Sequence, residues 1–246
     1  MSMSTGNPAL ARDPFAAYAM TGRGTATMTI SGTVGKTALL LAILTATAGW
    51  TWTQTGNGTL NPALLFGSLI GALIVGFITI FKPTVAPFTS PVYAALEGVL
   101  LGAISNMLEQ RYKGIAVQAT SLTFATLGIM LFLYGTRIIR VTQRLAMGIT
   151  AATGAVFLVY MVAFVLRLFH VPVSFLDSAS PLSIGISLVI VGIAAFNLLL
   201  DFDYIERGSR GEVPKVMEWY AAFSLLVTLV WLYLEILRLL SKMRDR

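Results

Sequence analysis

The longest uncharged stretch of the chain limits its fold most strongly. No charged residue lies between Lys36 and Lys82. A membrane-spanning helix needs about 20 mostly apolar residues, so this stretch is long enough for two spans. Of the whole chain, 56% is hydrophobic and only 11% is charged, whereas a soluble domain usually carries about 25% charged residues. We therefore predict an all-α, polytopic membrane protein whose main partner is the lipid bilayer.

The composition also excludes several classes of site. The sequence contains no cysteine and one histidine, His170, which excludes disulfides, cysteine-ligated metals and metal sites built from several histidines. The net charge of +6 is small, so we expect no nucleic-acid partner. In a membrane protein, basic residues instead set the orientation of the spans.

Seven apolar segments predict seven transmembrane helices. Residues 1–34 are predicted to form a flexible polar N-terminal tail, and residues 35–246 the transmembrane domain. We expect loops at KPTVAPFTSP, which contains three prolines, and at DFDYIERGSRGEVPK, which follows the sixth span. The predicted spans lie at about residues 37–52, 60–81, 92–108, 115–134, 145–168, 182–200 and 216–240.

Two further patterns concern orientation and helix packing. With a cytoplasmic N-terminus, the internal loops on the inner side receive most of the lysines and arginines, although the basic C-terminal tail argues the other way. We predict an inside N-terminus and an outside C-terminus. Residues that allow close approach of helices in lipid occur at small-xxx-small spacing in three pairs, Gly67 and Gly71, Gly98 and Gly102, and Ala151 and Ala155.

The acidic residue Glu97 lies inside the third predicted span, in YAALEGVLLGAIS. A carboxylate at the centre of a membrane helix costs about 2.5–3.5 kcal/mol on insertion scales. Glu97 must therefore be protonated, paired with a charge from another helix, or reached by water. This makes it a candidate for an ion or proton pathway.

A second acid, Asp201, ends the apolar run of the sixth span, where the helix dipole favours cations. Asn197 precedes Asp201 by one helical turn and shares its face, and Glu218 opens the seventh span. The predicted topology places Glu97, Asp201 and Glu218 at similar depth, so we expect them to converge. Asp203 is interpreted as a solvated neighbour, and Lys82 as either a topological anchor or the cation that faces the acids.

Four stretches together resemble the Bax inhibitor-1 family, and more narrowly its bacterial YccA-like, TMBIM-type members. They are YAALEGVLLGAIS, TRIIRVTQR, FNLLLDFDYIERG and MEWYAAFSLLVTLVWLYLEILRLL. The resemblance covers about residue 30 to the end of the chain. It implies a central last helix wrapped by the other six, a location in the bacterial cytoplasmic membrane, and a pH-sensitive calcium leak.

The resemblance also implies roles for particular residues. Asp201 matches the family's aspartate at the end of helix six, Glu97 its helix-three glutamate, and Lys82 the helix-two basic residue that latches onto the acids. The second aspartate of the family falls at Thr228. Without two close acids, nothing raises one pKa by like-charge repulsion, so either Glu97 or Glu218 replaces the missing partner or the gating differs.

These observations favour a passive pathway for calcium or protons, with calcium possible at Glu97 and Asp201 and no other cofactor. Asn197, Thr228 and backbone carbonyls are the further oxygen ligands that we expect, because calcium prefers several oxygens. An aspartyl protease needs a second buried aspartate, and a retinal protein needs a lysine within the last helix, so we predict no enzyme and no photoreceptor. The alternative function is a stress-protection protein that regulates partner membrane proteins or proteases without transport.

Overall fold

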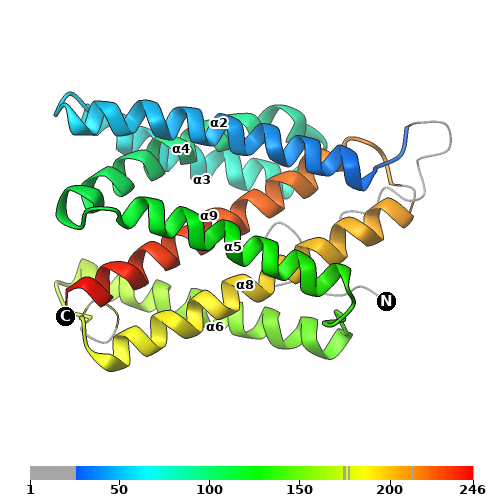
Figure 1. Cartoon of the computed structure of the whole chain (residues 1–246). Helices are drawn as coiled ribbons and strands as arrows, with labels where there is room; N and C mark the ends of the chain where they lie inside the picture. Colours follow the sequence, from blue (N-terminus) through cyan, green and yellow to red (C-terminus); the bar gives the residue numbers. More distant parts are fainter. Residues whose placement is uncertain (1–25, 174–175, 177, 212, 246) are drawn as a thin grey trace.

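The computed structural model describes residues 26–173, 176, 178–211 and 213–245. This part of the chain contains seven helices that are long and apolar enough to cross a membrane, which confirms the predicted all-α membrane fold (Figure 1). The helices are α2 (Ile30–Gly56), α3 (Pro62–Phe81), α4 (Ala86–Arg111), α5 (Ile115–Gly135), α6 (Gln143–Leu168), α8 (Pro181–Arg210) and α9 (Met217–Arg244), and a short 3-10 helix η1 (Pro83–Val85) precedes α4.

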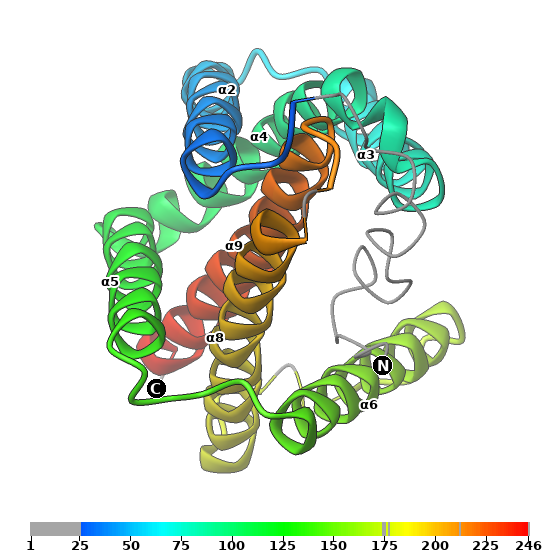
Figure 2. The same ribbon diagram turned by 90° about the vertical axis from the view of Figure 1, so that its right-hand side faces the viewer.

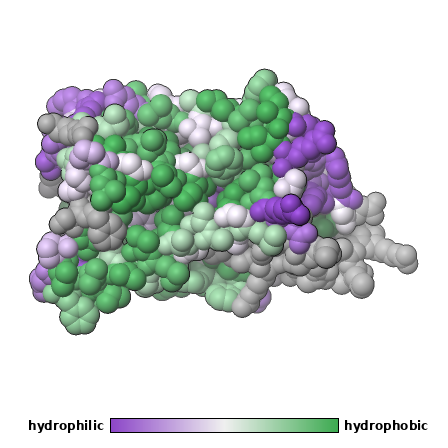
Figure 3. Space-filling model, turned by 90° about the horizontal axis from the view of Figure 1, so that it is seen from below, coloured by the Kyte–Doolittle hydropathy of each residue, from purple (hydrophilic) through white to green (hydrophobic). Residues whose placement is uncertain are grey.

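The helices run up and down between two ends of one bundle. We call the end where α2, α4, α6 and α9 begin the amino end, and the opposite end, where α9 finishes, the carboxyl end. In the space-filling view, hydrophobic residues form a broad central zone and hydrophilic residues gather toward the two ends (Figure 3). This distribution is the one that a bilayer requires, with apolar side chains facing hydrocarbon and polar ones facing water.

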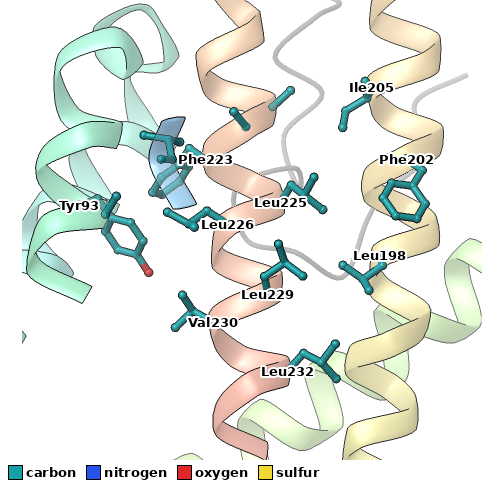
Figure 4. Packing of buried hydrophobic residues seen from close by; sticks show 14 of the residues in the cluster. Tyr93, Leu198, Phe202, Ile205, Phe223, Leu225, Leu226, Leu229, Val230 and Leu232 are labelled. Atoms are coloured by element: carbon teal, nitrogen blue, oxygen red, sulfur yellow. The ribbon is translucent and has the colours of Figure 1, made fainter. Parts of the chain in front are cut away.

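The last helix, α9, lies at the centre of the bundle. A larger share of α9 is buried than of any other described span, and it packs against α2, α4, α5 and α8 (Figure 2). Close up, α9 lies between Tyr93 of α4 on one side and Leu198 of α8 on the other (Figure 4). The ring of Tyr93 meets the ring of Phe223 edge to face, with centroids 4.9 Å apart, which is a favoured aromatic geometry.

Local sequence signals explain where several helices begin. Asn61 caps the backbone of α3 and is followed by Pro62, and Ser180 and Pro181 repeat this arrangement at α8. A proline at the first helical position loses nothing, because its missing N–H would have no partner inside the helix. Thr142 caps α6 in the same way, with its hydroxyl accepting from Leu145 N.

The first helix is longer than predicted at both ends. It spans Ile30–Gly56 instead of residues 37–52, because the hydroxyl of Thr29 caps it by accepting from Gly32 N. Residues 30–34 therefore belong to the bundle and not to a tail. The preceding segment is held as well, since Met28 N donates to Val213 O at 2.8 Å and Lys215 N donates to Ala26 O at 2.9 Å. The rest of the predicted tail, residues 1–25, lies outside the described residues.

The proline-rich segment KPTVAPFTSP was expected to be a loop, and the structure corrects this. Pro83 opens the 3-10 helix η1, Pro87 lies in the first turn of α4, and Pro91 lies inside α4. Prolines are tolerated in the first turn, and in transmembrane helices neighbouring groups compensate for an interior proline. The third span thus begins at Ala86 instead of about residue 92.

Of the small-residue pairs, Gly98 and Gly102 make the closest contacts. A Cβ atom at Gly98 would overlap the carbonyl of Leu44, and one at Gly102 would overlap the carbonyl of Ala48. The backbones of α4 and α2 therefore touch along this stripe, as small residues permit in lipid. Gly67, by contrast, has open space where its Cβ would lie.

We predict that Gly102→Ala destabilises the bundle, because the added methyl group must push α2 away from α4. Overpacking of this kind costs about 1–3 kcal/mol and should lower the melting temperature of the protein in mild detergent. Gly128→Ala in α5 is the matched control, since nothing lies within 4 Å of its Cβ position. Equal melting temperatures for the two variants would contradict the close α2–α4 contact.

Candidate functional site

Asp201 lies within α8 and not at its end. The helix continues to Arg210, so the prediction that the sixth helix ends near residue 200 is wrong. The added turns are stabilised by i, i+4 ion pairs, Arg207 with Asp203 at 2.8 Å and Arg210 with Glu206 at 2.5 Å. As a result, the carboxyl group of Asp201 is almost completely buried, with 1% of the residue exposed.

The central helix α9 supplies a hydroxyl group to Asp201. Ser224 Oγ donates a hydrogen bond to Asp201 Oδ1 at 2.9 Å, and both residues are buried. Thr228 lies one turn further along α9, is also buried, and donates to Ser224 O at 3.3 Å. The position where the resemblance implies a second aspartate is therefore a neutral hydroxyl on the same face as Ser224.

Asn197 extends this group of polar residues toward α6. Its side-chain amide donates to Thr153 Oγ1 of α6 and to Ile193 O, both at 2.8 Å. Its Oδ1 atom is buried and has no hydrogen-bond partner among the described residues. We define Asn197 and Asp201 of α8, Ser224 and Thr228 of α9, and Thr153 of α6 as the Asp201 cluster.

Glu218 lies in a different place, at the junction of α9 with the start of α2. The residue is 0% exposed, and one carboxylate oxygen accepts from Thr29 N at 3.0 Å and Thr29 Oγ1 at 2.9 Å. Lys36 of α2 donates to its other oxygen and forms the ion pair. Gly32 makes room for this contact, because a Cβ atom there would overlap the Glu218 carboxyl group. Glu218 thus joins α9 to α2.

Glu97 lies on α4 and is partly buried. Its hydrogen-bonding neighbour is the hydroxyl of Tyr93, one turn earlier on the same helix. The residues of α4 that contact α9 include Ser90, Tyr93 and Ser105. Glu97 lies two turns after Ser90 and one turn after Tyr93, so it belongs to the stripe of α4 that faces the central helix.

The three acids do not form one ion site. No group of three or more His, Cys, Asp or Glu side chains that would hold a metal ion occurs among the described residues. Neither of the two cavities described below is lined by Glu97, Asp201 or Glu218. The physical reason is that α9 separates α4 from α8 (Figure 4), while Glu218 is engaged by α2. The expected convergence in one pocket is therefore not observed.

Lys82 ends α3 and is exposed. The described residues include no ion pair that involves it, whereas Lys36, for which the sequence predicted no partner, pairs with a buried acid. Lys36 is also placed over the ring of Trp219, with Nζ 5.5 Å from the centroid. The sequence signal for Lys36 as the partner of Glu218 was the spacing of Thr29, Gly32 and Lys36, which lie within two helical turns.

Asp203 and Glu206 belong to the last turns of α8 instead of a solvated loop. Glu206 accepts hydrogen bonds from Tyr134 and from Arg137, the latter at 2.5 Å. This hydrogen bond to the carboxylate raises the pKa of Arg137, which stays charged. These acids are therefore structural partners of arginines at the amino end of the bundle.

Comparison with known proteins identifies the family. Residues 7–245, nearly the whole chain, match the Bax inhibitor 1 like family. The chain belongs to that family. No curated protein and no solved structure matches it. The resemblance noted in the sequence, which began at about residue 30, thus extends into the N-terminal segment.

For this Bax inhibitor 1 like protein we predict that Lys36 and Glu218 are coupled. Glu218→Gln or Lys36→Met alone should destabilise the fold, because each leaves one charge without its partner, and breaking a buried pair costs about 3–5 kcal/mol. The double variant should recover part of the loss, since both charges are gone. Melting temperatures in detergent measure this cycle, with Lys82→Met as a control expected to change little. Strictly additive effects would show that the ion pair does not form.

Proposed function

We propose that the protein provides a passive pathway for cations, calcium or protons, and that the Asp201 cluster is its selective element. The observation that supports this most is the near-complete burial of Asp201 inside a span, where its carboxylate accepts a hydrogen bond from Ser224 and lies one helical turn from Asn197. Intramembrane acids are rare and usually face the bundle interior or a water-filled path. That the protein belongs to this family and spans a membrane does not depend on this pathway.

The ligands of the Asp201 cluster suit weak binding of a passing ion better than tight binding of a resident one. Calcium takes 6–8 oxygen ligands when it is held tightly. The cluster combines one carboxylate with the Oδ1 atom of Asn197 and three hydroxyl groups. A site with a single negative charge binds a cation weakly, and weak binding lets an ion leave as well as enter.

The location of the cluster gives the proposed route. Its members come from α6, α8 and α9, so the route lies at the junction of these three helices. Among the described residues, α6 packs mainly against α8, so we infer that the α6 side opens more easily than the others. Glu97 lies on the opposite flank of α9, and the route does not require the exposed Lys82.

The proposed orientation places the amino end of the bundle in the cytoplasm, and the proposed location is the bacterial cytoplasmic membrane. The loop between α5 and α6 and the start of α6 contain Arg137, Arg140 and Arg144 without any acidic residue. An excess of arginine and lysine in short loops favours the cytoplasmic side. Asp201 then lies in the half of α8 nearer the cytoplasm.

We predict that Asp201→Asn lowers calcium flux into liposomes several-fold, because it removes the one negative charge of the cluster. Asp201 is the titratable member of the cluster, so any pH response of the flux should be lost in the same variant. A calcium-sensitive dye inside reconstituted liposomes measures the flux at several pH values. Glu109→Gln is the control, because it removes one carboxylate away from the α6–α8–α9 junction, at the carboxyl end of α4, where Glu109 accepts from Gly114 N at 2.5 Å.

Other outcomes separate the remaining possibilities. If Glu97→Gln alone abolishes flux while Asp201→Asn does not, the route follows α4 and the proposal is wrong. If the unmodified protein carries no cation at any pH, regulation of partner membrane proteins becomes the better function. Crosslinking in native membranes followed by affinity purification would then identify those partners.

A further inference from the structure

Two cavities lie end to end between α2 and α5. The larger, of about 470 Å³, is at the amino end, and the smaller, of about 280 Å³, lies toward the carboxyl end. Leu41 of α2 lines both cavities. We call the two cavities together the α2–α5 seam. In the view along the bundle, α2 and α5 stand apart on the same side of α9 (Figure 2).

The seam opens toward the surrounding lipid and not toward water. Its floor consists of buried side chains of the inner helices, among them Phe202 of α8 and Leu225 and Leu229 of α9. Its rim consists of apolar residues that are exposed, such as Val34 of α2, at 61%, and Leu131 of α5, at 54%. Because these helices span the bilayer, what meets the rim is hydrocarbon.

The charged groups of the seam lie only at its amino end. Among its lining residues, Arg137 and Glu206 are the charged ones, and both line the larger cavity. Arg137 has 49% of its side chain exposed, and both Arg137 and Arg210 pair with Glu206 at 2.5 Å. Two arginines around one glutamate leave a local excess of positive charge at the level where the spans end.

We propose that the α2–α5 seam binds an anionic phospholipid of the leaflet at the amino end. An acyl chain lies along the apolar floor, and the phosphate group meets Arg137 at the mouth. The size of the larger cavity is in the range of small-molecule sites, about 300–1,000 Å³, and basic pockets between spans on the cytoplasmic side are typical sites for anionic headgroups. The proposal is independent of the cation route, because no residue of the Asp201 cluster lines either cavity.

The headgroup part of the proposal is tested by charge-matched variants. Native mass spectrometry of the detergent-solubilised protein, titrated with phosphatidylglycerol or phosphatidylcholine, measures the preference for the anionic lipid. Arg137→Gln should lower that preference about fivefold, which corresponds to about 1 kcal/mol for one arginine near the surface. Arg144→Gln removes the same charge from the start of α6 but lines neither cavity, so it should keep the preference. An equal loss in both variants would overturn the proposal, because general surface charge would then explain the preference.

The acyl-chain part is tested by filling the seam. Ala38 lines the larger cavity, and Ala38→Trp should reduce the retention of both lipids severalfold. Ala125→Trp is the control, because Ala125 is exposed on α5 and lines neither cavity. Melting temperatures confirm that both variants are folded. If Ala38→Trp retains as much lipid as Ala125→Trp, the seam is not the binding site.

Discussion

The arrangement of the bundle depends on how the polar side chains of α9 are satisfied inside a membrane. Between helices in lipid there is little hydrophobic driving force, so packing and hydrogen bonds decide which helices meet. Several polar residues of α9 find their partners on particular neighbouring helices. Glu218 contacts Thr29 of α2, and Ser224 contacts Asp201 of α8. The polar positions of α9 thus select both the neighbour and its register.

The same logic continues toward the carboxyl end. Tyr233 meets Ser105 of α4 with oxygens 2.6 Å apart, and Glu235 accepts from Tyr160 of α6 at 2.8 Å. Ser224 and Tyr233 are nine residues apart, which is about half a turn out of phase at 3.6 residues per turn. They therefore face opposite sides of α9, toward α8 and α4. A central helix with polar groups all round needs a ring of partners, and this requirement makes α9 the axis.

Much of this fold follows from the sequence, because span number depends on runs of apolar residues and these are unambiguous here. Small-xxx-small spacing indicated the close contact at Gly98 and Gly102, but the same spacing leaves open space at Gly67, so spacing alone does not identify such a contact. Helix ends were less predictable. Hydropathy falls after residue 200, but Phe202 and Ile205 are still buried and ion pairs extend α8 to Arg210. Hydropathy records where apolar residues stop dominating the sequence, whereas the helix and its buried face continue beyond that point.

The candidate site was predicted in part for a different reason. Topology places acidic residues at a depth along the bundle axis, but it does not give the rotation of each helix or the side of α9 on which it lies. Asp201 and Asn197 were identified because they share one face of a single helix. Ser224, the partner of Asp201, was missed, because a serine inside an apolar span carries no charge to signal a role. Glu97 has a similar predicted depth but packs on another flank.

The change in direction from one side chain of α8 to the next also explains how this helix lines two different environments. Asn197 and Asp201, one turn apart, face the junction with α6 and α9, whereas Phe202 and Glu206, also one turn apart, face the α2–α5 seam. Adjacent residues on a helix point about 100° apart, so Asp201 and Phe202 face different sides of the same turn. A polar environment and an apolar one are thereby separated by the width of one helix. The proposed ion route and the proposed lipid site are consequently distinct and share α8 as a common wall.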